Sequence, residues 1–148
     1  MDIERLLRSL NARSARYVVI GATAFPVHGY ARATLDIDLF IDPERGNAEL
    51  VRAALAEFGY DVTDLTVEDL LSKKVLIRQY RLQTDVHPFV KGATFAAVWA
   101  NRVPGVIGET PTVFASLDDL IAMKSAAGRP KDLEDLRVLR ELRARKGP

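Results

Sequence analysis

The chain has 148 residues, a formal net charge of +1 and no cysteine, and 48% of its residues are hydrophobic. This length predicts one domain over residues 1–148, with enough apolar side chains for a buried core. The lack of cysteine excludes a disulfide framework and a thiolate zinc site. No apolar run is long enough for a membrane span and no secretory signal is visible, so we expect a cytoplasmic protein without a membrane partner.

The first half of the chain predicts two strands between helices. An amphipathic helix comes first, because Ile3, Leu6, Leu7 and Leu10 recur at helical spacing. An apolar strand over 17–20 ends at Gly21, and a short helical segment is expected over 24–30. After a strand over 36–41, Asp42-Pro43 should open a helix that Gly59 ends. The buried face of that helix is expected to comprise Leu50, Val51, Ala54, Leu55 and Phe58.

The second half predicts shorter strands and two terminal helices. Residues 60–71 are interpreted as a short strand and an irregular acidic connection. Residues 75–82 and 84–87 form either a hairpin or one bent strand. A short helix is expected over 95–100, and edge strands over 102–107 and 112–114. Ser116 should cap a helix over 117–127, and Arg129-Pro130 should start the last one. These helices, over 116–145, are expected to pack on the sheet, with an apolar stripe of Leu133, Leu136, Leu139 and Leu142 and frayed residues from 144 onward.

Two acids in the strand over 36–41 are the first candidate for chemistry. Asp36 and Asp38 alternate with aliphatic residues, so both carboxylates should project from one strand face. Such a pair is most often a solvated face. It gains interest here because a Gly21 turn precedes it, and clustered carboxylates repel one another unless a cation neutralises them. With only two histidines, carboxylate-held Mg²⁺ or Mn²⁺ is the expected metal.

A third acid and several cations extend this candidate site. Asp85 is the best third ligand, because it lies on another predicted strand, where it shares a face with His87; an ordinary turn-proximal acid is the alternative. The Gly21 turn offers backbone N–H groups to phosphate, and Thr23 adds a hydroxyl. The candidate cations for phosphate oxygens are Arg32, Lys124 and Arg129. His28 is interpreted as a packing or capping residue.

The charge distribution is uneven along the chain. The segment from Asp36 to Asp69 contains ten acids and two arginines, whereas the segment from Lys124 to Lys146 contains eight bases and four acids. An acidic half and a basic tail are typical of a metal site and an anionic substrate, respectively. The alternative is a solvated helix whose cationic end is favoured by the helix dipole.

These motifs resemble the minimal nucleotidyltransferase superfamily, related to DNA polymerase β. The residues in question are Ile-Gly-Ala-Thr-Ala from Ile20 and His-Gly-Tyr-Ala-Arg-Ala-Thr-Leu-Asp-Ile-Asp-Leu from His28. The second segment is closest to the AbiEii-like group found in toxin–antitoxin systems. The segments around Lys124 and over Arg129–Leu136 are similar to that group's C-terminal motif.

The resemblance implies a polymerase β-like palm, an α/β (α+β) fold with a small mixed sheet flanked by helices. It implies Asp36, Asp38 and Asp85 as metal ligands, and the turn of Gly21, Ala22 and Thr23 at the triphosphate. It also implies Lys124 on phosphate, with Asp132 orienting it. Ala22 stands where the family pattern has Gly or Ser, and its Cβ restricts the approach of the backbone to phosphate.

Two functional hypotheses follow. The first is a Mg²⁺- or Mn²⁺-dependent enzyme that moves NMP from an NTP to a hydroxyl on RNA, such as tRNA, or on protein. It would be the toxin of a pair with an antitoxin partner, and a homodimer is one way to complete the acceptor site. The second, motivated by Ala22 and the short chain, is a catalytically lapsed nucleotide-binding or protein-interaction module. A metal-dependent phosphodiesterase is disfavoured, because that chemistry usually needs more histidines.

Overall fold

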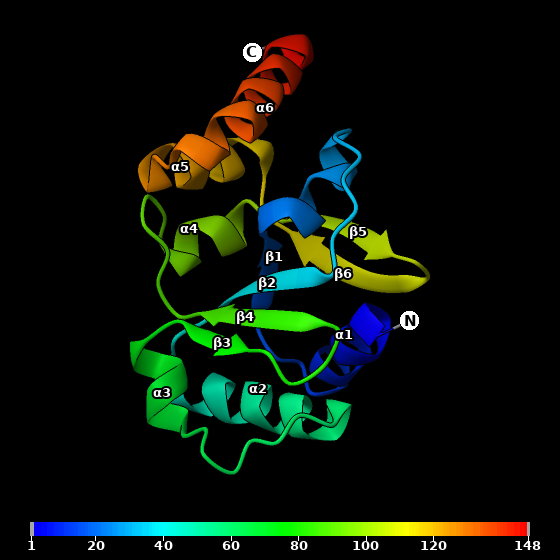
Figure 1. Cartoon of the computed structure of the whole chain (residues 1–148), viewed down its shortest axis with the longest axis vertical. Helices are drawn as coiled ribbons and strands as arrows, with labels where there is room; N and C mark the ends of the chain where they lie inside the picture. Colours follow the sequence, from blue (N-terminus) through cyan, green and yellow to red (C-terminus); the bar gives the residue numbers. More distant parts are fainter. Residues whose placement is uncertain (1, 148) are drawn as a thin grey trace.

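The protein is described by a computed structural model that covers residues 2–147, over which the chain forms one six-stranded mixed sheet (Figure 1). The order across the sheet is β3-β4-β2-β1-β6-β5. The two central strands are antiparallel to each other, while β2 is parallel to β4 and β1 is parallel to β6. The predicted mixed α/β fold is confirmed. The strands are β1 (Tyr17–Ile20), β2 (Asp36–Ile41), β3 (Val75–Ile77), β4 (Gln83–His87), β5 (Val103–Ile107) and β6 (Thr110–Phe114).

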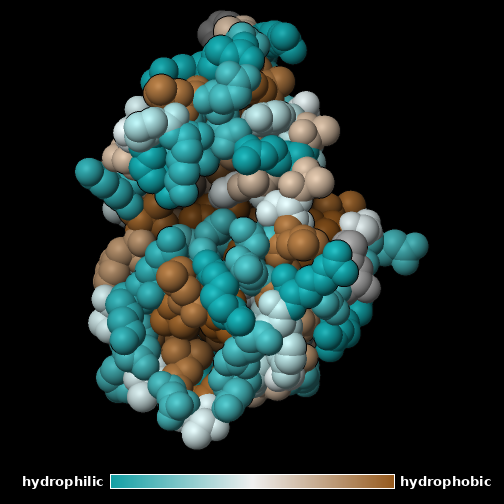
Figure 2. Space-filling view, viewed as in Figure 1, coloured by the Kyte–Doolittle hydropathy of each residue, from teal (hydrophilic) through white to brown (hydrophobic). Residues whose placement is uncertain are grey.

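The helices lie on both sides of the sheet. Figure 1 shows α1, α2 and α3 beside one side of strands β2, β4 and β3, and α4, α5 and α6 toward the other. Figure 2 shows apolar side chains in the recess between the C-terminal helices and the sheet. Within residues 2–147, each helix is too short or too polar to cross a bilayer. The helices are α1 (Asp2–Ala12), α2 (Arg45–Phe58), α3 (Val67–Ser72), α4 (Phe95–Ala100), α5 (Leu117–Ala127) and α6 (Leu133–Lys146).

Alternation along β2 separates a core face from a polar face, as the sequence predicts. Ile37 and Leu39 are fully buried, whereas Asp36 is exposed and Asp38 is half-buried. Phe40 lies on the acid-bearing face but is buried, because it packs edge-on against Phe95 of α4 with ring centroids 5.5 Å apart. The acids therefore occupy the part of this face that α4 leaves uncovered.

The α2 helix starts later than the sequence predicts. Its first residue is Arg45 rather than a residue at Asp42-Pro43, because the Glu44 carboxylate accepts hydrogen bonds from the backbone N–H groups of Gly46 and Asn47 at 3.0 and 3.1 Å. The helix ends at Gly59 as expected. One predicted core residue is wrong, because Leu50 is 37% exposed; the buried apolar positions are Ala48, Val51, Ala54, Leu55 and Phe58.

Residues 60–82 hold a helix where the sequence analysis expects a strand and an irregular segment. The α3 helix begins after Thr66, which forms a reciprocal capping box with Asp69. The predicted strand over 75–82 ends at Ile77, and β3 forms an antiparallel hairpin with β4. Beyond Ile77, the Gln79 side chain accepts a hydrogen bond from the backbone N–H of Asp61 and donates one to the carbonyl oxygen of Asp61. This segment therefore lies against the chain just after α2 and not in the sheet.

Several other boundaries differ in detail. The predicted helix over 24–30 is two 3₁₀ turns, η1 (Gly21–Ala24) and η2 (Pro26–His28). The buried His28 is a packing residue, as predicted, and its Nε2 lies 2.8 Å from the carbonyl oxygen of Ala115. Strand β6 is internal rather than an edge, because it pairs with both β1 and β5.

The C-terminal end also departs from the prediction. Residues 130–132 form a 3₁₀ turn, η3 (Pro130–Asp132), before α6, which stays helical to Lys146 instead of fraying at 144. Leu133 is 65% exposed and so does not belong to the apolar stripe that Leu136 and Leu139 form. Pro148 lies outside the described residues.

A buried network of charges joins α5 and α6 to the segment after η2. The side chains of Asp132 and Asp135 are 4% and 8% exposed. Lys124 Nζ lies between them, 3.1 Å from Asp132 Oδ1 and 3.3 Å from Asp135 Oδ2. Arg129 donates two hydrogen bonds to Asp132, and Arg32 pairs with Asp135. Each buried acid therefore has cationic partners, which is the condition for tolerating it in a core.

This network lowers the pKa of both acids. The Arg129 guanidinium is the main cause that holds the pKa of Asp132 down at about 2, against the opposing effect of burial. Burial raises the pKa of Asp135, but the hydrogen bonds from Arg32 and Tyr30 and the charge of Lys124 outweigh it, so the net shift is downward. Both acids are consequently stabilised in their ionised form.

Core packing gives a first testable prediction. Leu55→Ala should lower the free energy of unfolding by about 2–5 kcal/mol, because it leaves a cavity at a fully buried position. Leu50→Ala on the same helix should have a much smaller effect, because Leu50 is partly exposed. Urea denaturation followed by circular dichroism measures both. Equal losses for the two variants would contradict the assigned face of α2.

The charge network predicts a dependence of stability on pH. The pKa of Asp132 falls from an ordinary 3.8 to about 2 in the folded protein, so its contribution is fully present above about pH 4 and is lost as pH falls toward 2. Asp132→Asn should therefore destabilise the protein at pH 6, and the deficit should narrow between pH 4 and pH 2. Thermal unfolding across this range tests it, with the exposed Asp64→Asn as the control. A deficit that does not vary with pH would disprove the assignment.

Candidate functional site

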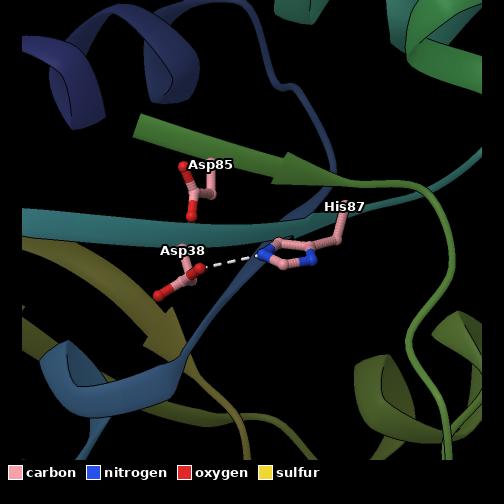
Figure 3. A group of neighbouring side chains, drawn as sticks. All are labelled: Asp38, Asp85 and His87. Carbon is pink, nitrogen blue, oxygen red and sulfur yellow. Dashed lines mark hydrogen bonds and ion pairs between the residues drawn. The ribbon is translucent and has the colours of Figure 1, made fainter. Parts of the chain in front are cut away.

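Two strands bring three candidate metal ligands together. Asp38 on β2 and Asp85 on β4 are direct partners in the parallel register, and His87 follows two residues later on the same face. The ligand atoms of Asp38, Asp85 and His87 all lie within 4.8 Å of one another (Figure 3). We call this group the acid–histidine cluster. Its side chains are 29%, 16% and 13% exposed, so they are accessible from solvent but largely shielded by the protein.

Hydrogen bonds orient each member of the cluster. His87 Nε2 lies 2.9 Å from Asp38 Oδ1. Arg78, which follows β3, donates to Asp85 Oδ1 at 2.6 Å, and Lys74 Nζ lies 4.0 Å from Asp85 Oδ2. The Asp85 hydrogen bond is the main cause that raises the pKa of Arg78, and the charges of Asp36 and Asp38 add to it. These contacts show a local excess of negative charge that draws cations to this part of the sheet.

The sequence-predicted triad is only partly assembled. Asp38 and Asp85 are brought together, whereas Asp36 lies outside the cluster, exposed at the start of β2 and paired in register with Gln83. His87 is the residue that sequence reasoning did not place among the ligands. Its signal was the Thr-Asp-Val-His alternation in residues 84–87, which puts His87 on the same face as Asp85.

The Gly21 turn lies directly against the cluster. Gly21 has φ +70°, and a Cβ at this position would be 2.6 Å from Asp38 Oδ2. Only glycine combines that backbone conformation with such a close carboxylate. Ala22 is half-buried and packs on the core. The Thr23 hydroxyl donates to the backbone carbonyl of Asp36 at 2.8 Å, so its hydrogen is used to fix the turn to β2.

The predicted phosphate-binding cations belong to the buried charge network. Arg32 and Lys124 both contact Asp135, and Lys124 and Arg129 both contact Asp132. The pKa of Arg129 is raised, chiefly by its hydrogen bond to Asp132 and to a smaller extent by the charge of Asp38. The network and the acid–histidine cluster are therefore within electrostatic reach of each other. The Lys124–Asp132 contact of the C-terminal motif is present in the structure.

The donor set fits a hard divalent cation. Two carboxylates on facing strands supply the oxygen ligands that Mg²⁺ and Mn²⁺ prefer. His87 orients Asp38 through its hydrogen bond, which is the role that neighbouring groups have around metal-binding carboxylates. The half-buried position also leaves room for water or substrate oxygens to complete the coordination.

Comparison with known proteins identifies the family. No curated protein matches the chain. Residues 1–141 match the family described as "Nucleotidyltransferase of unknown function (DUF6036)". That match spans all six strands, the Gly21 turn, the acid–histidine cluster and the charge network. The paired acids on neighbouring strands, the glycine turn beside them and this match lead to one conclusion: the chain belongs to the DUF6036 family of nucleotidyltransferases.

Proposed function

We propose that the protein is a Mg²⁺- or Mn²⁺-dependent nucleotidyltransferase that moves NMP from an NTP to a hydroxyl acceptor. The observation that carries this proposal is the position of Asp38. Its carboxylate lies against the Gly21 turn on one side and within the acid–histidine cluster on the other. A metal-binding acid and a phosphate-binding turn in contact are what transfer from a triphosphate requires.

The reaction forms one phosphorus–oxygen bond and breaks another. The acceptor oxygen attacks the α-phosphorus of the NTP, the bond from that phosphorus to the bridging oxygen breaks, and pyrophosphate leaves. When bound by Asp38 and Asp85, the divalent cation neutralises charge on the phosphate oxygens. We assign Asp85 Oδ2 as the atom that takes the proton from the acceptor hydroxyl. The reason is that Oδ1 already accepts the Arg78 hydrogen bond, whereas Oδ2 is 4.0 Å from Lys74 Nζ.

The turn and the charge network position the triphosphate in this proposal. Backbone N–H groups at Gly21 and Ala22 are the donors for its terminal phosphates, as at other glycine turns. Lys124 supplies a positive charge, and Asp132 and Asp135 restrict its ammonium group. Since Arg32 pairs with Asp135, we assign it to holding the network together rather than to contacting phosphate.

A second candidate function is a lapsed nucleotide-binding module. Ala22 adds a Cβ where the family pattern has Gly or Ser. Arg78, which donates a hydrogen bond to Asp85, supplies positive charge to that carboxylate in place of a metal ion. Binding of NTP without transfer would favour this function.

The resemblance of residues 28–39 to AbiEii-like proteins supports a further proposal. In it, the enzyme is a toxin and its partner is a protein antitoxin. A homodimer of the enzyme completes the acceptor site.

Loss of the cluster carboxylates tests the proposed reaction. Asp38→Asn and Asp85→Asn should each lower transfer of α-labelled NMP by on the order of a hundredfold or more, because the phosphate charge loses its stabilisation. Both should also weaken Mn²⁺ binding, measured by electron paramagnetic resonance. The control is Asp64→Asn, which removes an exposed acid between α2 and α3. Transfer that survives either substitution in the cluster would contradict the enzymatic proposal.

The glycine turn gives a sharper test. Gly21→Ala should abolish most transfer and weaken Mn²⁺ binding, because the new Cβ would meet Asp38 Oδ2 at 2.6 Å. Backbone strain also lowers stability by about 1–2 kcal/mol, since an L-residue disfavours positive φ. Gly59→Ala is the matched control, with φ +119° and no atom within 4 Å of the new Cβ. It should lose stability but keep metal binding and transfer. If both variants kept them, the turn would have no role in the site.

A further inference from the structure

An aromatic cavity lies on the same sheet face as the acid–histidine cluster. Its volume is about 580 Å³, within the range of small-molecule sites. Four large aromatic side chains line it, and an ion pair between Arg16 and Asp42 supplies polar groups. We call this the aromatic cavity. The aromatic residues in its lining are Phe40, Phe89, Phe95 and Trp99.

The strands connect this cavity to the cluster. Phe40 follows Asp38 by two residues on β2, and its direct partner in the parallel register is His87. Alternate strand residues point to the same face and are roughly 6.6 Å apart along the strand. The aromatic cavity therefore begins beside His87, one alternation beyond Asp38 and Asp85, at the carboxyl ends of β2 and β4.

The Gly21 turn lies at the opposite end of the cluster. Strand β1 is antiparallel to β2 and pairs Ile20 with Asp38, so Gly21 continues toward Asp36. Arg16, which precedes β1, contacts Asp42 at the other end. The order along β2 is thus the glycine turn, the cluster and the aromatic cavity, which puts the metal-binding acids between the other two features.

This order indicates which substrate the cavity receives, given the proposed function. In phosphoryl transfer the attacking and leaving oxygens lie roughly in line on opposite sides of the phosphorus. If the Gly21 turn holds the leaving pyrophosphate, the acceptor hydroxyl approaches from the far side of the cluster. That side is where the aromatic cavity opens.

The side chains of the cavity are suited to stacking on a planar base. Phe89 is 64% exposed at the rim of the cavity, Phe95 and Trp99 are half-buried, and Phe40 is buried at its base. Phe95 and Trp99 stack at 5.7 Å between centroids, and the Arg102 guanidinium lies 3.9 Å above the Trp99 ring. Accessible aromatic rings with a neighbouring arginine are a common platform for single-stranded nucleic acid, and here Phe89 is the ring that is open to solvent.

We propose that the aromatic cavity binds the terminal bases of a single-stranded RNA acceptor and directs its end hydroxyl toward the acid–histidine cluster. This rests on the proposed function for the direction of approach. A serine or threonine acceptor on a protein has no ring to stack and a tyrosine has only one, whereas an RNA end offers successive bases, so the lining favours RNA over protein. Arg16 and Asp42 give the cavity a hydrogen-bond donor and an acceptor for base edges.

The chain's single tryptophan makes the cavity directly observable. A short oligoadenylate with a free 3′ hydroxyl should quench Trp99 fluorescence, in buffer without NTP or divalent metal. Phe89→Ala should weaken RNA binding about tenfold in fluorescence anisotropy, a magnitude in keeping with the loss of one stacked base. Val106→Ala, which shortens another exposed apolar side chain on the edge strand β5, should bind RNA as the unmodified protein does.

Two further readouts separate this proposal from the reaction itself. Phe89→Ala should retain its circular dichroism spectrum and its Mn²⁺ binding, while its label transfer to RNA falls in proportion to RNA affinity. RNA binding without quenching of Trp99, or equal affinity for Phe89→Ala and Val106→Ala, would overturn the cavity assignment. Label transfer to protein that is unaffected by Phe89→Ala would also overturn it. Quenching that persists in an Asp38→Asn variant would support the cavity, whatever that variant does to transfer.

Discussion

The parallel pairing of β2 with β4 is the constraint on which the rest of the site depends. Its register sets Asp38 directly opposite Asp85 and places His87 two residues further on. The opposite face of these strands carries the apolar side chains of Ile37, Leu39 and Val86, which are fully buried. Thr84, a polar side chain on that face, has its hydroxyl in a hydrogen bond with Tyr60. A slip of one residue would turn the acids into the core and the aliphatic side chains into solvent, so hydrophobic burial enforces the geometry of the acid–histidine cluster.

Electrostatics divides the polar side of the molecule into two complementary groups. The acid–histidine cluster has an excess of negative charge that draws Arg78 and Lys74 toward it. The buried network has three cations around two acids, Asp132 and Asp135, and it joins α5 and α6 to the segment that follows the glycine turn. In the proposed function, an anionic substrate at the cluster would lie within electrostatic reach of this network, since the charge of Asp38 acts on Arg129.

The membership in a nucleotidyltransferase family agrees with this arrangement at the level of fold and chemistry. What the structure adds is direction. The glycine turn, the cluster and the aromatic cavity follow one another along β2, an order that is compatible with the in-line displacement of the proposed function. The α4 helix has a double role, because Phe95 buries Phe40 and also lines the cavity. The same packing that closes the core therefore shapes the wall of the aromatic cavity.

The sequence by itself determined the alternation of Asp36 and Asp38 with aliphatic residues and the Gly21 turn, because periodicity and glycine act locally. The mixed fold and the pair of Lys124 with Asp132 followed from the resemblance of its motifs to a family. The sequence did not determine that His87 joins the cluster, that Asp36 stays outside it, or that Arg32 pairs with Asp135. It also did not determine α3, whose capping box of Thr66 and Asp69 lies in an acidic segment. The pairings among these residues join segments far apart in the chain, and only strand register and helix packing decide which side chains meet.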